Sequence, residues 1–407
     1  MTLVLVLEQR FERTRDGRVW GPGPFFTAVW PRYLEAFDRL RVLARIRDVR
    51  SVAPDWQVAD GGAVSFTPVP YYVGPWQYLK RLPRIAVALS RTVRPEDAVI
   101  LRVPSTIADL LERFLRQRGH PYGVEVVGDP YEVFAPEVMR HPLRPLLRGW
   151  GTHRLRRVCA GADAALYVTD RILQQRYPCG GTCVTASNVE LPADALVPQP
   201  RRMPAAPRPR VLVTLGTLEQ LYKGTDVLID AVGECRRRGL DLRLIVGGDG
   251  KYRPALEQRA RRVGAADCIE FRGHIASREA VRALLDDADL FVLPSRTEGL
   301  PRAVIEAMAR ALPCVATDVG GIPELLPPED LVPPGDPVAL ADRIGELLGD
   351  PARWERTSAR NLQNARPYRE EILQARRAEF YACVLERTAA WQQSARRGYT
   401  EVRTPAT

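Results

Sequence analysis

The sequence predicts an α/β protein built from two doubly wound, Rossmann-like domains. Its 407 residues are too many for a single hydrophobic core of ordinary size. Short apolar runs of strand length alternate with segments of helical spacing, a pattern typical of parallel βαβ units. The alternation stops in a stretch that is rich in proline, residues 191–209, and then starts again. We therefore expect a linker at 191–209 between two domains.

The first domain is expected to cover residues 1–190. Its apolar runs have the length of buried strands, and its helical segments repeat apolar residues every three or four positions. We expect strands at residues 2–7, 41–46, 98–103, 123–127 and 164–168, and helices at 27–40, 105–118 and 170–177.

The second domain is expected to cover residues 210–369 and to repeat the same alternation. We expect strands at residues 210–215, 242–246, 269–271, 290–293 and 314–317, and helices at 224–238, 253–263, 278–288, 301–311 and 338–348. Residues 370–394 have the composition of one or two long helices, and the polar residues 396–407 are expected to form a frayed tail.

Composition narrows the class of protein. No apolar run reaches the length of a membrane span, and residues 2–7 lack the basic leader and cleavage site of a signal peptide, so we expect a cytoplasmic protein. The seven cysteines are scattered without the spacing of a zinc site, which favours free thiols and no bound metal. The net charge of +10 suits phosphates or an anionic membrane, and no nucleic-acid motif accompanies it.

The most informative stretch runs from Pro294 to Glu306, after the expected strand 290–293. Ligands of open α/β sheets bind at the carboxyl ends of the strands, and the free amides at the start of the next helix favour an anion such as a diphosphate. Glu298 lies at the turn, where its carboxylate could accept hydrogen bonds from sugar hydroxyls. Glu306 lies about 7–8 Å along the helix, where a carboxylate suits the paired hydroxyls of a ribose.

The two glutamates, spaced by seven intervening residues, resemble the E-x7-E signature of retaining GT-B glycosyltransferases, in particular family 4. The resemblance is strong from residue 210 to about 350. It implies a GT-B fold, in which two Rossmann-like domains face a cleft and the final helices cross back to the first domain. It assigns Glu298 to the donor sugar and Glu306 to the ribose. Gly299, Leu300 and Pro301 would form the phosphate turn, with Pro301 only shaping it.

Lys223 follows the first strand of the second domain, in a segment that resembles the one whose lysine neutralises the donor diphosphate in this family. It is one of only three lysines in the chain. A fixed ammonium there suits the negative charge that develops on a leaving diphosphate. Thr217 stands where the family usually has an arginine, so either the second charge comes from elsewhere or Lys223 acts alone.

Four further positions follow from the resemblance. Gly273 and Ile275 are expected to contact the nucleotide base through their backbone, beside His274. Gly23, in the Gly-Pro-Gly-Pro loop at 21–24, would lie near the donor phosphate or form an ordinary turn. Asp129 stands where many relatives have a histidine, so it would bind the sugar or an acceptor hydroxyl, or else cap the following turn.

Residues 73–91 and 142–157 mix Arg, Trp and Leu. In the first, Tyr78, Leu79 and Leu82 could form an apolar face beside Lys80 and Arg81. Such a face either packs on the sheet or lies on a membrane surface. A lipid-linked acceptor would agree with peripheral contact at the inner face of the membrane.

The sequence therefore predicts a retaining glycosyltransferase that moves a sugar from a nucleotide-diphosphate sugar to an acceptor. We expect no metal or other cofactor and no nucleic-acid partner. The acceptor is either a surface polysaccharide or lipid-linked glycan, or a secondary metabolite. The alternatives are a catalytically silent protein that binds nucleotide sugars, and a sugar-nucleotide epimerase or a phosphorylase of the same fold.

Overall fold

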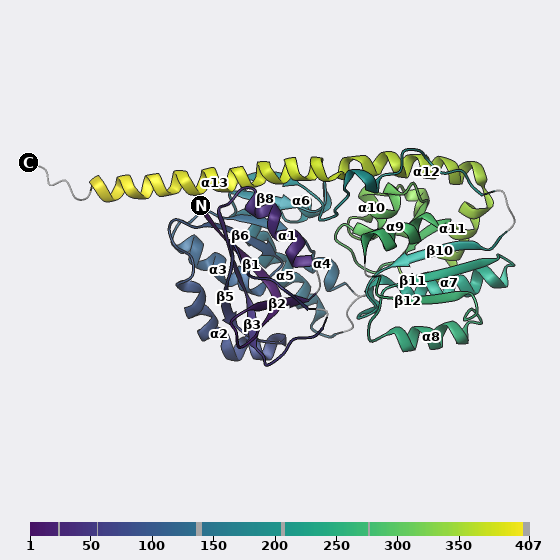
Figure 1. Ribbon diagram of the computed structural model, residues 1–407, viewed down its shortest axis with the longest axis horizontal. Coiled ribbons are helices and arrows are strands. Elements are labelled where there is room, and N and C mark those ends of the chain that lie inside the picture. The colour runs from purple at the N-terminus through teal and green to yellow at the C-terminus, as the bar shows by residue number, and fades with distance from the viewer. Residues whose placement is uncertain (23–24, 55, 136–140, 205–207, 276, 402–407) are drawn as a thin grey trace, which may run out of the picture.

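A computed structural model describes residues 1–407 except 23–24, 55, 136–140, 205–207, 276 and 402–407. The chain forms two α/β domains that lie side by side, and one long C-terminal helix runs along the first of them (Figure 1). Each domain has its own parallel sheet covered by helices. The two doubly wound sheets predicted from the sequence are confirmed. Among the described residues, none of the helices combines the length and the apolar character needed to cross a bilayer.

The sheet of the first domain has a parallel core and a small antiparallel extension. Its parallel strands, in spatial order, are β5 (Val64–Pro70), β3 (Arg39–Asp48), β1 (Thr2–Arg13), β6 (Ala98–Val103), β7 (Gly123–Val126), β8 (Ala164–Tyr167) and β9 (Thr182–Thr185). β2 (Val19–Pro22) and β4 (Trp56–Val58) extend the far end of β1 in antiparallel fashion. The helices of this domain are α1 (Phe25–Leu34), α2 (Gly74–Ser90), α3 (Thr106–Gln117), α4 (Pro130–Val133), α5 (Arg144–Ala160) and α6 (Ile172–Arg176).

The sheet of the second domain is wholly parallel in the part of the chain that is described. Its strands, in spatial order, are β12 (Ile269–Gly273), β11 (Leu242–Gly247), β10 (Arg210–Leu215), β13 (Leu290–Leu293), β14 (Cys314–Thr317) and β15 (Leu331–Val332). The helices are α7 (Thr225–Arg237), α8 (Arg253–Arg262), α9 (Arg278–Asp286), α10 (Arg302–Ala309), α11 (Pro337–Gly349) and α12 (Pro351–Ala365). The strand order reverses between β10 and β13, and ligands of such sheets bind at that switch point.

Several predicted elements agree closely with the structure. The strands expected at 98–103, 210–215, 290–293 and 314–317 have the predicted bounds. The helix expected at 27–40 is wrong at its end, because α1 stops at Leu34 and β3 begins at Arg39. Leu40 pairs with Leu3 of β1, so ladder hydrogen bonds replace a further helical turn. The sequence analysis did not anticipate β2, β4, β5, β9, β15 or α12.

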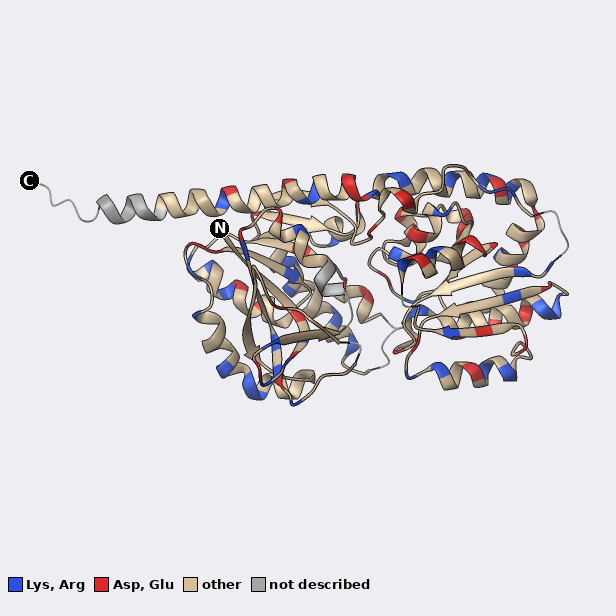
Figure 2. Cartoon of the chain, viewed as in Figure 1, with Lys and Arg blue, Asp and Glu red and all other residues tan. Residues whose placement is uncertain are grey.

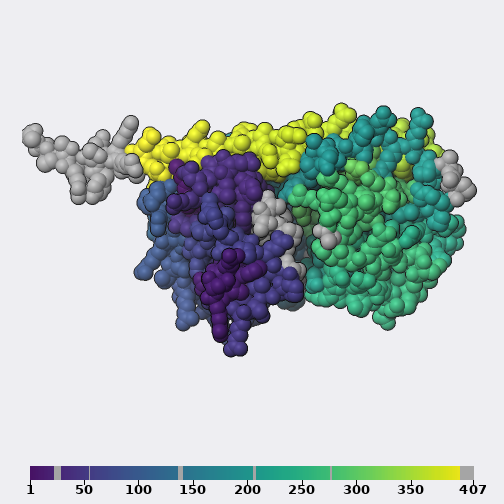
Figure 3. All heavy atoms as spheres, in the orientation of Figure 1, coloured from purple at the N-terminus to yellow at the C-terminus, as the bar shows by residue number. Residues whose placement is uncertain are grey.

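The final helix, α13 (Glu370–Glu401), returns to the first domain and covers its sheet beside β8 and β9. Its buried face includes Leu373, Phe380 and Val384. Gly123 at the start of β7 makes this close approach possible, because a Cβ there would lie 2.6 Å from Val384. Figure 3 shows the helix, in yellow, running over the first domain.

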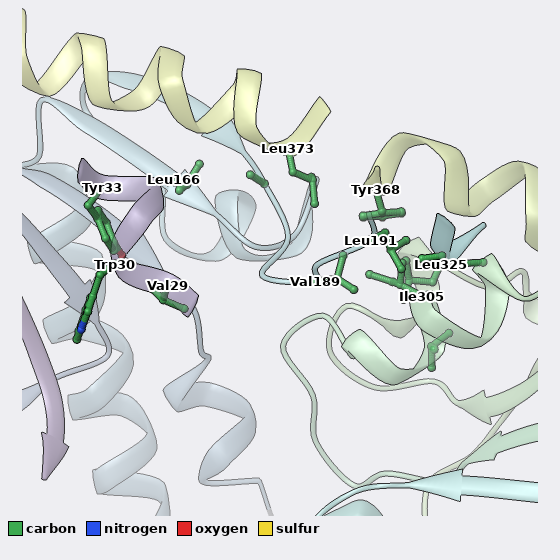
Figure 4. Close-up of a cluster of buried hydrophobic side chains, with 14 of the residues drawn as sticks. Val29, Trp30, Tyr33, Leu166, Val189, Leu191, Ile305, Leu325, Tyr368 and Leu373 are labelled. Carbon is green, nitrogen blue, oxygen red and sulfur yellow. The ribbon is translucent and has the colours of Figure 1, made fainter. Parts of the chain in front are cut away.

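One apolar cluster joins the two domains. Figure 4 shows it extending from Trp30 and Leu166 in the first domain to Ile305 and Leu325 in the second. Leu191 lies between them, and its carbonyl oxygen accepts a hydrogen bond from the amide of Glu370, 2.9 Å away. The connecting segment is therefore packed into the core at its first residue.

A carboxylate of the second domain also holds the first domain. Glu324, in the 3-10 turn Ile322–Glu324, accepts hydrogen bonds from the backbone amides of Asp170, Arg171 and Ile172 at 2.5, 3.0 and 2.7 Å. These amides begin α6 and have no partner within that helix, so a carboxylate from the other domain caps it.

We predict that Glu324→Ala loosens the contact between the domains. Hydrogen bonds to a charged acceptor contribute about 1.5–3 kcal/mol each, so the urea midpoint should fall and the amides of residues 170–172 should exchange faster in hydrogen–deuterium exchange. Glu346→Ala, which removes a half-exposed surface glutamate, is the control and should change neither. Unchanged exchange at 170–172 in Glu324→Ala would contradict the capping role.

Candidate active site

The turn from Glu298 to Pro301 lies at the carboxyl end of β13 and faces the first domain. A Cβ at Gly299 would lie 3.4 Å from the carbonyl oxygen of Val127, which follows β7. Leu300 packs against the cores of both domains. Pro301 caps the start of α10, where its missing N–H is not needed. The turn predicted to bind phosphate therefore lies at the junction of the two domains.

Glu298 is held from two sides. The Nζ of Lys223 donates to its Oε1 at 2.7 Å, and the Oγ of Ser295 donates to the same oxygen at 2.6 Å. The Glu298 side chain is 7% exposed and that of Lys223 is 19% exposed. Two of the predicted site residues, 75 positions apart in the chain, thus form a largely buried ion pair. Removing either charge would leave the other one buried without its partner, which destabilises the fold.

Close backbone approaches bring Lys223 to this position. Lys223 ends the 3-10 turn Leu221–Lys223, and Gly224 follows with φ of +70°. A Cβ at Gly224 would lie 1.9 Å from the carbonyl oxygen of Pro294, so only glycine fits. Arg296 joins the same two segments, donating to both carboxylate oxygens of Asp226 at 2.8 and 2.7 Å.

The second positive charge that the family usually has beside this lysine is not supplied by Arg296. Its guanidinium is occupied by Asp226 and by the carbonyl oxygen of Leu221, at 2.6 Å. Within the described ranges, Lys223 is the one cation that pairs with Glu298.

A cavity of about 230 Å³ lies on the other side of α10 and brings together Glu306, His274 and Ile275. Burial raises the pKa of the Glu306 carboxyl, and the positive charges of Arg302, Arg278 and Arg282 act in the opposite direction. Gly273, with φ of +69°, ends β12 just before His274. Glu306 and Ile275 thus line the same cavity. Gly273 is next in sequence to His274, which also lines it.

Asp129 is 4% exposed and its carboxylate is fully used by the protein. One oxygen accepts from the amide of Tyr131 at 2.9 Å and from the Tyr177 hydroxyl, and the other accepts from Arg176. This favours the alternative that Asp129 caps the following turn over the alternative that it contacts substrate. Gly23 lies outside the described residues.

The first domain contains a larger cavity, of about 680 Å³, which was not predicted from the sequence. It opens at the carboxyl ends of β1, β6 and β7, and Val127 belongs to its wall. Its polar lining includes Glu8, Arg10, Arg45 and Arg102, and Trp30, Trp56 and Tyr71 add aromatic surface. These residues come from separate strands and loops, so no local motif could have found them.

The structure contains no cluster of three or more His, Cys, Asp or Glu able to hold a metal ion within the described part of the chain. The seven cysteines are free thiols in the structure.

We predict that Gly320→Ala displaces the Glu298 turn. Gly320 has φ of +51°, and a Cβ there would lie 1.9 Å from the Glu298 carbonyl oxygen. Gly335→Ala is a matched control, because its φ is +81° but nothing lies within 4 Å of the added carbon. Both variants should lose about 1 kcal/mol from the positive φ, and Gly320→Ala should lose clearly more in urea unfolding. Equal losses would mean that the turn tolerates the contact.

We predict that Glu306→Gln stabilises the unliganded protein at pH 7. A raised pKa means that the folded state favours the neutral carboxyl, so its ionisation costs stability at pH values above the ordinary pKa of glutamate. The gain in urea midpoint should shrink as the pH falls toward 4, where the wild-type carboxyl becomes neutral. The exposed Glu371→Gln is the control, and a gain that does not depend on pH would contradict the burial argument.

Residues 209–350 match the family model of the glycosyl transferases group 1. Over 360 residues the chain is 25% identical to protein CapJ of Staphylococcus aureus, covering 87% of this chain and 88% of that protein. It is 28% identical over 360 residues to a GDP-mannose-dependent phosphatidylinositol monomannoside mannosyltransferase of Mycolicibacterium smegmatis, covering 79% of this chain and 86% of that enzyme.

Among solved structures, Anabaena HepE in complex with UDP and glucose superposes with a TM-score of 0.64 at 16% identity, over 93% of this chain and 98% of HepE. This likeness shows the fold of the whole chain, which is GT-B. The second domain is therefore similar to the group 1 glycosyl transferases, and the two domains together have the GT-B fold.

Proposed function

We propose that this protein is a retaining glycosyltransferase of the E-x7-E type, which transfers a sugar from a nucleotide-diphosphate sugar to an acceptor in the cleft. The observation that carries the proposal is the Lys223–Glu298 pair, held at 2.7 Å on the turn before α10. The pair supplies a cation and a carboxylate, and it lies just before the start of α10, where helix amides point outward. A sugar diphosphate needs all three kinds of group.

The predicted residues of the second domain each take a role in this proposal. Lys223 neutralises the leaving diphosphate, while Glu298 accepts hydrogen bonds from the sugar. Gly299 and Leu300 offer amides to phosphate, and Pro301 shapes the turn. Glu306 holds the ribose hydroxyls, and Gly273 and Ile275 line the base with backbone.

The chemistry requires a base for the acceptor hydroxyl and a site for the leaving group. In the proposed reaction the bond between the anomeric carbon and the diphosphate oxygen breaks, and the acceptor oxygen bonds to the same face of that carbon. The acceptor proton passes to the departing phosphate. Lys223 supplies the positive charge that this oxygen needs, and the proposal includes no metal or other cofactor.

The acceptor would bind in the first-domain cavity, because Val127 lies both in its wall and against Gly299. The relative from Mycolicibacterium is named for a phosphatidylinositol mannoside acceptor. By analogy we propose a lipid-linked glycan or surface polysaccharide acceptor, used at the inner face of a membrane. A secondary metabolite is the alternative acceptor.

We predict that Glu298→Ala and Lys223→Met each reduce transfer at least about 100-fold, the usual cost of removing one preorganised electrostatic contact. The measurement is donor consumption over a panel of nucleotide sugars, with the anomer of the product determined by NMR. Lys251→Met, on the exposed surface of the same domain, should retain wild-type turnover.

Two results would overturn the proposal. Tight binding of a nucleotide sugar without turnover, even with acceptors supplied, would indicate a silent binding protein. An inverted anomer in the product would exclude retention.

A further inference from the structure

Two helices on one side of the first domain expose large apolar side chains. On α2, Trp76 is 77% exposed and Leu79 is 55% exposed. On α5, Leu146 is 70% exposed and Trp150 is 54% exposed. Tyr78 and Leu82 are the residues with which this part of α2 packs against the core. Packing within the chain therefore does not explain why Trp76 and Leu79 are apolar. Grouped exposed side chains of this kind mark interaction surfaces.

The exposed apolar residues of α2 and α5 lie on a shared surface. α2 and α5 both pack against α3, and Arg154 of α5 pairs with Asp109 of that helix at 2.8 Å. The guanidinium of Arg154 also lies 4.3 Å from the centroid of the Trp150 ring. Buried residues of all three helices belong to one apolar cluster, so α2 and α5 cover the same face of the sheet. We call the surface formed by Trp76, Leu79, Lys80, Arg84, Arg144, Leu146, Arg148 and Trp150 the basic face.

The charge around these residues is of one sign. α2 contains Lys80, Arg81 and Arg84, and α5 contains five arginines; neither helix contains Asp or Glu. Arg154 and Arg157 are paired with Asp109 and Glu112 of α3. The other basic residues of α2 and α5 have no carboxylate partner among the described residues. Figure 2 shows blue residues along α2 at the lower edge of the first domain.

A surface groove of about 640 Å³ continues the basic face. It is lined by Arg144, Arg148, His153, Arg156, Arg176 and Tyr131, and no acidic side chain among the described residues lines it. Arg176 is paired with Asp129 and Glu132, so Arg144, Arg148 and Arg156 supply the positive charge that these pairs leave. Arg148 lies 3.4 Å from the centroid of the Tyr131 ring and donates to its carbonyl oxygen at 2.8 Å. The groove thus offers several fixed cations at one place, which suits phosphate groups.

The groove is connected to the candidate active site by a short segment. Tyr131 follows Val127 by four residues, and Val127 lines the first-domain cavity and faces Gly299. A phosphate-bearing ligand on the basic face would therefore be close to the proposed acceptor site.

We propose that the basic face docks on an anionic lipid bilayer, with its tryptophan and leucine side chains in the interface and its arginines on lipid phosphates. Tryptophan suits the boundary between headgroups and acyl chains, and leucine suits the apolar side of it. Each basic residue near an anionic surface strengthens binding by a factor of about five. The inference rests on the proposed use of a lipid-linked acceptor. Lipid binding can nevertheless be measured separately from sugar transfer.

The test is cosedimentation of the full chain with vesicles of phosphatidylcholine alone and with about 30% phosphatidylglycerol. Wild type should bind the anionic vesicles at least about tenfold more tightly than the neutral ones, and less tightly at high salt. Lys80→Glu/Arg84→Glu and Leu146→Ser/Trp150→Ser should each weaken this binding at least about tenfold.

Two matched controls lie on the second domain. Arg261→Glu/Arg262→Glu makes the same change in net charge on exposed residues of α8, and Val338→Ser removes an exposed apolar side chain from α11. Both should bind vesicles like wild type.

The inference is overturned if wild type ignores anionic vesicles, if it binds single-stranded RNA in their place, or if the control variants lose as much binding as the basic-face variants. Nucleotide-sugar hydrolysis is measured in parallel, because the donor site lies in the other domain. If the wild-type protein hydrolyses no nucleotide sugar, that result counts against the proposed function. The conclusion from the vesicle binding then still stands.

Discussion

The donor site depends on the contact between the loop that follows β13 and the turn that follows β10. These two strands are neighbours at the point where the strand order reverses, so their loops diverge around a crevice. Gly224 allows one loop to meet Pro294 of the other, and the Arg296–Asp226 pair fixes both. With the backbone held in this way, Lys223 reaches Glu298. An added side chain at Gly224 would separate the two charges.

Buried carboxylates near the proposed site differ in how their charge is satisfied. Asp129 and Glu125 are buried, and the donors around them satisfy their charges; Glu125 accepts from Tyr33 at 2.8 Å and from Arg102 at 2.8 Å. Glu306 is different, because burial raises its pKa and no hydrogen bond to it is described. A carboxylate that is desolvated without a full set of partners costs stability, and functional sites are the usual places for that cost.

The two domains are joined by features that act at different places. The apolar cluster around Leu191 and the α13 helix hold them along one side, while Glu324 caps α6 nearer the cleft. The basic face lies on the first domain alone.

Much of this protein can be predicted from local pattern. Apolar run length and turn residues gave the bounds of β6, β10, β13 and β14, because a buried parallel strand has a short, continuous apolar run that breaks where the backbone leaves the ladder. The positions of Glu298 and Glu306 on a strand–turn–helix unit also followed from their spacing. The order of strand, turn and helix in this unit is local, so neighbouring residues are enough to predict it.

Only the tertiary structure decided which groups meet. It paired Asp129 with Arg176 and Tyr177, turned Tyr78 and Leu82 toward the core, and ended α1 early so that Leu40 could pair with β1. It also brought Lys223 to Glu298 and joined α5 to α3 through the Arg154–Asp109 pair. These contacts link residues far apart in the chain, and hydrophobic period and turn chemistry contain no information on such distant partners. The sequence by itself determined the elements and the chemistry at their ends; the packing of the sheets decided which of those ends form a site.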